Sequence, residues 1–294
     1  MPVAAFAPAK VNLYLHVTGQ RADGYHLIDS LVGFVDVGDH LTAAPAADLS
    51  LEVSGPEAAM LAAVGENNLV LRAARLLAER AGISPGAALQ LQKNLPVAAG
   101  IGGGSSNAAA ALRALSRLWR LSLGKAELCH LGVRLGADVP ACLYGRTVWV
   151  SGIGERLEPA GTLAEAGILL ANPRIPLATA AVFAARRSPP SDSGRFAPMP
   201  TDAGGLAHLL MRRRNDLTEA AISLVPEIGA VLARLGRLPG ALLARMSGSG
   251  ATCFALFADR DGAKAARAAL AAAQPSWWCA AGGFVGKASL DGLG

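Results

Sequence analysis

The chain has 294 residues, a length that suits two domains of ordinary size. Hydrophobic residues make up 52% of it and charged residues 17%, a balance that supplies a core and excludes a disordered chain. The net charge of +5 is spread along the sequence apart from one short basic cluster, Arg212 to Arg214, so no surface for nucleic acid is indicated.

The cysteines lie singly and have no histidine cluster near them, which argues against a zinc site and against a disulfide framework. The segment from Met1 to Pro8 lacks the basic and apolar regions of a signal peptide. No stretch approaches the roughly 18 uninterrupted apolar residues of a membrane-spanning helix. We therefore expect a cytoplasmic protein that makes no contact with a membrane.

Hydrophobic periodicity predicts strands that alternate with helices, which is typical of an α/β or α+β fold. The first strand, 10–18, alternates cleanly and is expected to be half-buried, with Lys10 and Asn12 on one face. Residues 188–205 are rich in Pro and Ser and are expected to form a long mobile loop, and a domain boundary is expected near residue 158. Further strands are expected near 49–53, 89–93, 147–150, 168–171, 241–246, 252–257 and 277–285, and helices within 67–82, 106–119, 126–135, 206–235 and 261–273.

The most informative segment is a glycine-rich turn at 96–109 that precedes a predicted helix. Its glycines lack Cβ atoms where the chain must turn sharply, and residues 105–107 can cap the helix. Amide donors and the positive end of the helix dipole would then favour a phosphate. No lysine follows the glycines and the third glycine of the dinucleotide fingerprint is missing, so neither common nucleotide motif applies. The residues alone leave two interpretations open, a phosphate site and a flexible strand–helix connection.

Other segments contain residues that could perform chemistry, yet each also has an ordinary structural interpretation. Asp138, in the run from Leu135 to Pro140, could simply cap a helix, and Lys10 at a strand start could be solvated. Tyr25 and His26 could pack at the turn that follows Gly19. A second glycine turn, 245–252, could be a plain hairpin.

Taken together and in this order, the segments resemble the GHMP kinases, a superfamily named after galacto-, homoserine, mevalonate and phosphomevalonate kinases. The opening, 7–26, and the continuation of the glycine turn through Ser106 and Asn107 resemble the 4-diphosphocytidyl-2-C-methyl-D-erythritol kinases in particular. The matched segments are 7–39, 93–112, 133–157, 172–183, 212–218 and 245–257.

The resemblance implies a two-domain fold with the active site in the cleft between the domains. Residues 1–158 would form an ATP-binding domain of the ribosomal-S5-domain-2-like kind, and 159–294 a ferredoxin-like α/β domain. The implied reaction uses ATP, with Mg²⁺ as its counter-ion, to phosphorylate the 2-hydroxyl of a small molecule, 4-diphosphocytidyl-2-C-methyl-D-erythritol. This step belongs to the non-mevalonate route to isoprenoid precursors. The enzyme would be a monomer or a homodimer.

The resemblance also assigns roles to residues. Asp138 would be the base for the attacking hydroxyl and Lys10 its catalytic partner, because phosphoryl transfer needs positioning and charge neutralisation. The 245–252 turn would brace the ATP loop, and 214–217 would be structural. ATP-binding residues would be Asn68, Pro96, Val97, Ala98, Ala99, Gly100, Ile101, Gly102, Gly103, Gly104, Ser105 and Ser106. Substrate-binding residues would be Asn12, Tyr25, His26, Thr179 and Phe183, and the metal ligands stay open.

Three positions depart from the family pattern. Ala98 and Ala99 stand where the family often has glycine, which predicts a stiffer start to the loop. Val32 replaces a second aromatic residue, so the base would be stacked on one side unless Phe183 supplies the other surface. Two alternatives remain: a GHMP kinase for homoserine or a mevalonate-like alcohol, and a non-enzymatic nucleic-acid-binding protein.

Overall fold

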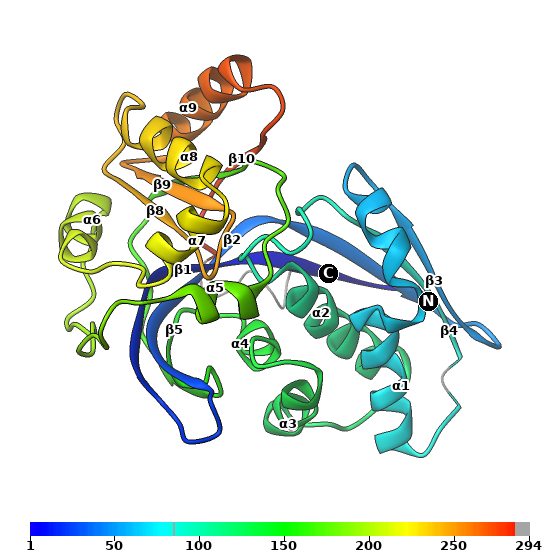
Figure 1. Ribbon diagram of the computed structural model, residues 1–294. Coiled ribbons are helices and arrows are strands. Elements are labelled where there is room, and N and C mark those ends of the chain that lie inside the picture. Colours follow the sequence, from blue (N-terminus) through cyan, green and yellow to red (C-terminus); the bar gives the residue numbers. More distant parts are fainter. Residues whose placement is uncertain (85, 286–294) are drawn as a thin grey trace.

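The computed structural model describes residues 1–84 and 86–285 (Figure 1). Two long strands, β1 (Val3–Gln20) and β2 (His26–Ala44), form an antiparallel hairpin across the middle of the molecule. Helices α1 to α4 lie on one side of this hairpin, and a second sheet with its own helices lies on the other (Figure 1). The hairpin therefore takes part in both halves of the molecule.

The first sheet has the order β3-β4-β2-β5-β6, with β1 paired to β2, and its pairs are antiparallel except for β3 with β4. Its shorter strands are β3 (Leu49–Ser54), β4 (Ala87–Gln92), β5 (Val148–Gly152) and β6 (Arg156–Pro159). Its helices are a 3-10 helix, η1 (Ala58–Asn67), and α1 (Leu69–Ala81), α2 (Gly103–Leu118), α3 (Lys125–Leu135) and α4 (Val139–Tyr144).

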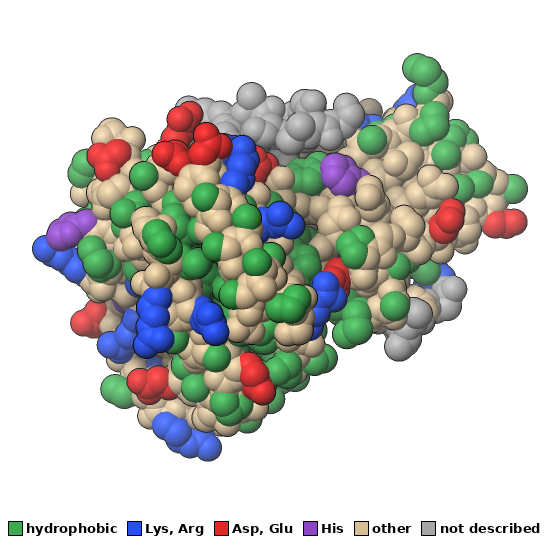
Figure 2. All heavy atoms as spheres, turned by 90° about the horizontal axis from the view of Figure 1, so that it is seen from above, with side chains coloured by type: hydrophobic (Ala, Val, Ile, Leu, Met, Phe, Trp, Pro, Cys, Tyr) green, Lys and Arg blue, Asp and Glu red, His purple; other side chains and the backbone are tan. Residues whose placement is uncertain are grey.

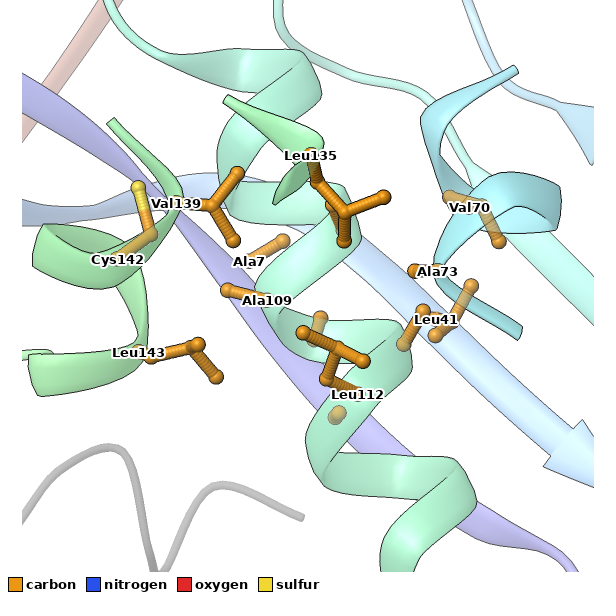
Figure 3. Packing of buried hydrophobic residues seen from close by; sticks show 14 of the residues in the cluster. Ala7, Leu41, Val70, Ala73, Ala109, Leu112, Leu135, Val139, Cys142 and Leu143 are labelled. Carbon is orange, nitrogen blue, oxygen red and sulfur yellow. The ribbon is translucent and has the colours of Figure 1, made fainter. Parts of the chain in front are cut away.

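The central helix of this half, α2, is rich in alanine on the faces that it buries. Ala108 to Ala111 are fully buried, and their short side chains allow α1, α4 and the strands to approach closely. Figure 3 shows Ala109 and Leu112 of α2 among Val139 and Leu143 of α4. The alanine excess of the sequence thus has a packing role here.

The second sheet has the antiparallel order β10-β7-β9-β8, and the order of its strands and helices along the chain is the ferredoxin-like β-α-β-β-α-β. Its strands are β7 (Gly167–Asn172), β8 (Leu243–Met246), β9 (Cys253–Phe257) and β10 (Trp278–Gly283). Its helices are α5 (Thr179–Ala185), α6 (Ala203–Met211), α7 (Thr218–Leu224), α8 (Glu227–Gly236) and α9 (Arg260–Ala273). The predicted fold class is confirmed.

A buried hydrophobic cluster joins the two halves. Leu13 and Tyr14 of β1 pack in it with Phe254 and Leu256 of β9 and with Leu210 of α6. The expectation of a half-buried first strand is therefore wrong, since both of its faces are covered between residues 5 and 17. The proposed domain boundary at 158/159 falls in the last residues of β6 and stays a prediction.

Most of the expected elements are present, but some were missed or placed differently. The long strand β2, the short strand β6, the 3-10 helix η1 and the short helix α4 were not predicted. Residues 188–202 have no helix or strand, whereas α6 already begins at Ala203. Asp29 accepts hydrogen bonds from the Gly194 amide at 2.6 Å and from the Ser193 hydroxyl at 3.0 Å, and the expected mobility of this segment stays a prediction.

The spread of charged residues along the sequence can be compared with their distribution on the surface. On the face drawn in Figure 2, basic, acidic and hydrophobic side chains are interspersed. None of the helices in the described ranges combines the length and hydrophobicity needed to cross a bilayer.

Candidate functional site

A cavity of about 1160 Å³ lies where the two halves meet. The first half contributes the middle and the end of β1, the turn before β2, the glycine turn and the residues just before α4 to its lining. The second half contributes α5 and the turn between β8 and β9. A cavity of this size is large enough for substantial organic ligands.

Lys10 and Asp138 meet in this cavity. The Lys10 Nζ atom lies 2.8 Å from Asp138 Oδ1, and the lysine side chain is 5% exposed whereas the aspartate side chain is 47% exposed. Asp138 stands at the N-cap position of α4, but its side chain makes no capping hydrogen bond. The helix-cap interpretation of this residue is therefore wrong, and its carboxylate faces the lysine and the open cavity instead.

The glycine turn adopts left-handed backbone conformations at three positions. Gly100 and Gly102 have φ values of 71° and 63°, and Ala98 has 52°. A Cβ atom on Gly102 would lie 3.0 Å from the Lys10 Cβ, and one on Gly100 would lie 2.5 Å from the Gly250 carbonyl oxygen. A left-handed conformation costs Ala98 about 1–2 kcal/mol that glycine would avoid. The glycine that the family often has at this position would therefore adopt the same turn without that cost.

The first turn of α2 has no side-chain cap. Its N-cap residue is Gly102, and no side-chain capping bond is made there. Two of the three expected capping residues are engaged elsewhere: the Ser106 hydroxyl donates to the Pro8 carbonyl at 2.8 Å, and the Asn107 amide donates to Asp39. That expectation is wrong, and its consequence is that the amide donors at the start of the helix stay available to an anion.

Most of the predicted ATP residues line the cavity, but three do not. Ile101 is buried in the shared core, and its carbonyl accepts the Lys10 N–H at 3.0 Å. Ser106 is buried against β1, and Pro96 lies outside the lining. Those that line it are Asn68, Val97, Ala98, Ala99, Gly100, Gly102, Gly103, Gly104 and Ser105.

The second glycine turn braces the first, as expected. The Ser247 hydroxyl donates to the Gly100 carbonyl at 3.0 Å, and the Thr252 amide donates to the Ala99 carbonyl at 3.1 Å. Asn215 supports this turn in its own right, because its side-chain amide donates to the Met246 and Gly248 carbonyls at 2.8 Å. The structural role expected for 214–217 is confirmed by these bonds.

A buried ionic network that sequence reasoning missed stands behind the glycine turn. Asp39, which is fully buried, accepts from Lys93 Nζ at 2.5 Å, from Asn107 Nδ2 at 2.8 Å and from the amides of Asn94 and Leu95 at 2.7 and 2.8 Å. Burial lowers the pKa of Lys93, and the neighbouring Asp39 carboxylate opposes that shift. Both Lys93 and Asn107 line the cavity, so Asp39 holds two polar side chains at its wall.

The other end of the cavity is aromatic. The rings of His26 and Phe183 are stacked with centroids 4.9 Å apart, and Tyr25 beside them is 61% exposed. Burial, with a smaller contribution from Arg186, lowers the pKa of His26 and favours the neutral imidazole. Val32, in β2, does not line the cavity, and its side chain is buried in the hydrophobic core of the first half.

A side-chain hydrogen bond joins α5 to the second glycine turn at the cavity wall. The Thr179 and Ser249 hydroxyl oxygens are 2.8 Å apart, and both residues line the cavity. Ser249 was not singled out from the sequence, although it lies in a motif that was. Among the described residues no group of three or more His, Cys, Asp or Glu side chains is placed to hold a metal ion.

Comparison with family models identifies both halves of the chain. Residues 68–146 match the GHMP kinases N terminal domain, and residues 201–276 match the GHMP kinases C terminal model. The first match contains α2 and Asp138, and the second contains the turn between β8 and β9.

Two curated relatives are similar over nearly their whole length. The 4-diphosphocytidyl-2-C-methyl-D-erythritol kinase of Paramagnetospirillum magneticum is 54% identical, over 93% of this chain and 95% of that protein. The protein of the same name from Rhodospirillum rubrum is 54% identical, over 95% and 92%.

Solved structures agree with this. A crystal structure of a 4-(cytidine 5'-diphospho)-2C-methyl-D-erythritol kinase superposes with a TM-score of 0.76 at 35% identity, covering 96% of this chain and 99% of that one. A homoserine kinase from Cytophaga hutchinsonii has a TM-score of 0.68 at 18% identity, over 97% and 95%, and shows the same fold.

The network around Asp39 yields a testable prediction. Asp39→Asn replaces an acceptor with an NH₂ group that faces donors, and we expect it to lower the free energy of unfolding by about 3 kcal/mol. Urea denaturation measures this value. Asp48→Asn, at an exposed position, is the matched control and should change it by less than about 0.5 kcal/mol. Equal effects of the two substitutions would contradict the stabilising role of the network.

Proposed function

This chain belongs to the GHMP kinase family, among the 4-diphosphocytidyl-2-C-methyl-D-erythritol kinases, and on that premise we propose the reaction that it catalyses. It transfers the γ-phosphoryl group of ATP to the 2-hydroxyl of 4-diphosphocytidyl-2-C-methyl-D-erythritol, in the non-mevalonate route to isoprenoid precursors. The observation that carries the proposal is the Lys10–Asp138 pair beside the uncapped start of α2, in one cavity. We place this small-molecule enzyme in the cytoplasm and assign it no nucleic-acid partner.

The nucleotide binds by its phosphates at the glycine turn. The amides at the start of α2 and the positive end of its dipole attract the phosphate oxygens. Lys93 adds a positive charge at the same wall: a Cβ on Gly103 would lie 3.2 Å from its Nζ atom. The adenine end lies toward Asn68 and Leu69, which line the cavity at the start of α1.

The transfer itself needs a proton acceptor and charge neutralisation. Asp138 takes the proton of the 2-hydroxyl as its oxygen forms a bond to the γ-phosphorus, while the bond from that phosphorus to the β-phosphate oxygen breaks and ADP leaves. Lys10 keeps the Asp138 carboxylate oriented and offsets negative charge on the transferred group.

Recognition of the acceptor involves the aromatic end of the cavity. The cytosine ring stacks on Tyr25 and on the His26–Phe183 pair, and the neutral His26 imidazole can donate or accept a hydrogen bond at the base edge. Asn12 and Thr179 contact the rest of the substrate. A homoserine molecule has no base that these rings could bind.

Magnesium enters as the counter-ion of ATP. Mg²⁺ is commonly held by one or two carboxylates together with substrate phosphates and water. Asp138 lines the cavity beside Lys10, whose side chain borders Gly102 of the glycine turn, so its carboxylate would supply one such oxygen while the phosphates and water supply the others. When bound, the ion neutralises charge on the β- and γ-phosphates.

The proposed function is tested with the purified chain, ATP, Mg²⁺ and either the cytidylyl substrate or homoserine. We expect ADP and a phosphate monoester on the 2-oxygen, located by phosphorus NMR, from the cytidylyl substrate. Turnover of homoserine alone would overturn the substrate assignment, and steeply salt-dependent RNA binding without kinase activity would overturn the enzyme assignment.

Removal of the proposed base should abolish most of the turnover. Asp138→Asn keeps the size of the side chain but cannot take a proton, so we expect kcat to fall at least about a hundredfold. Steady-state kinetics measures this effect. Asp261→Asn, at a side chain that is 92% exposed on α9, serves as the control and should leave kcat unchanged. Near-normal turnover of Asp138→Asn would remove Asp138 from the role of base.

Loss of the exposed Tyr25 ring should weaken binding of the cytidylyl substrate but not binding of ATP. Because stacking of a base on an aromatic ring is worth about 1–3 kcal/mol, we expect Tyr25→Ala to raise KM for the cytidylyl substrate about tenfold and to leave KM for ATP nearly unchanged. Tyr25→Phe keeps the ring and is the matched control. Parallel losses for both substrates would mean that Tyr25 supports the fold.

A further inference from the structure

One buried polar atom in the cavity wall has no protein partner. Asn12 is 3% exposed, lines the cavity and lies two residues from Lys10 on β1. Its side-chain oxygen, Oδ1, makes no hydrogen bond, although a buried polar group without a partner costs free energy. Its amide nitrogen, Nδ2, donates to the Ser30 hydroxyl oxygen at 2.8 Å.

The orientation of the Asn12 amide is set by a directional chain of hydrogen bonds. The Ser30 hydroxyl donates its only proton to the Tyr14 carbonyl oxygen at 2.5 Å, and a carbonyl oxygen can only accept. The Ser30 oxygen therefore has no proton for Asn12 and can only accept from it. Consequently Asn12 must turn its NH₂ group toward Ser30 and its oxygen away from it.

Local backbone irregularity makes this chain possible. Asn12 pairs with Val32 and Tyr14 with Leu31, so the register of β1 against β2 shifts between the two β1 residues. At this bulge the Tyr14 carbonyl and the Asn12 side chain both come within reach of Ser30, which is fully buried and does not line the cavity. The main chain of Asn12 is held as well, because its N–H donates to the Ser247 hydroxyl at 3.1 Å.

We propose that Ser30 is a positioning residue for the acceptor substrate, because it compels Asn12 to present a hydrogen-bond acceptor to a hydroxyl of the polyol portion. This inference rests on the proposed function and deepens it. Lys10 and Asn12 project from the same stretch of β1, about 7 Å apart along the strand. An alcohol that donates to Asn12 Oδ1 is thereby held beside the Lys10–Asp138 pair. An Asn12 side chain turned the other way would offer NH₂, which repels the hydroxyl proton.

A double-mutant cycle tests whether Ser30 acts through Asn12. Ser30→Ala removes the acceptor for Nδ2, and we expect it to lower kcat/KM for the cytidylyl substrate about tenfold, which corresponds to about 1.4 kcal/mol, with KM for ATP unchanged. In the Asn12→Ala background the same substitution should have less than a twofold effect. Equal losses in both backgrounds, or parallel losses for ATP, would overturn the proposal.

Two further variants separate positioning from a general loss of structure. Ser30→Thr retains a hydroxyl and should recover most of the activity. Ser223→Ala is the matched control, because the Ser223 hydroxyl also donates to a main-chain carbonyl, that of Ala220, but lies on α7 outside the cavity lining. It should leave both KM values unchanged. A Ser30→Thr variant as impaired as Ser30→Ala, with unchanged thermal stability, would count against the hydroxyl.

A measurement without substrate keeps the test independent of the proposed function. The side-chain NH₂ signals of Asn12, assigned by their loss in Asn12→Ala, should exchange slowly with solvent in the ¹⁵N-labelled wild-type protein. Exchange as fast as that of the exposed Asn67 would contradict the Ser30–Asn12 pairing. A wild-type chain that shows slow exchange but does not phosphorylate the cytidylyl substrate would contradict the proposed function and leave the pairing intact.

Discussion

The site depends on one constraint: the strand that carries Lys10 and Asn12 is hydrogen-bonded through its main chain to both glycine turns. The Lys10 N–H donates to Ile101 in the first turn, and the Asn12 N–H donates to Ser247 in the second. Ser247 in turn donates to Gly100, so the three segments form a closed set of contacts. Functional side chains placed on such a scaffold need little reorganisation when charge develops in the reaction.

Buried carboxylates extend this scaffold in two directions. Asp39 holds Lys93 and Asn107 at the cavity wall beside the glycine turn. Asp29, on the opposite side of the hairpin, accepts from the Tyr14 hydroxyl at 2.8 Å and from the Gly194 amide, so it fastens an irregular segment of the second half to β1. A buried carboxylate is tolerated only where donors surround it, and here those donors come from the segments that need to be fixed.

The sequence predicted the contacts that depend on short motifs and missed those that depend on pairing. The meeting of Lys10 with Asp138 and the bracing of the glycine turn join segments far apart in the sequence, and both were expected because each segment carries a short motif that resembles the family. Asp39 was missed because it belongs to no recognised motif, and its partners Lys93 and Asn107 are brought to it only by the fold, from 54 and 68 residues away. The strand β2 was overlooked because both of its faces are largely buried, and such a strand lacks the alternation that marks a half-exposed one. Ser30 lies in this strand, so its role was missed as well.

The choice of acceptor cannot come from the fold. A homoserine kinase at 18% identity shares the fold with a TM-score of 0.68, so the fold by itself does not select the acceptor. In the proposed function, discrimination between acceptors comes from side chains at the end of the cavity where Tyr25, His26 and Phe183 provide ring surfaces. These residues lie on the turn before β2 and on α5, so they can differ between relatives while the glycine turn and β1 keep their geometry.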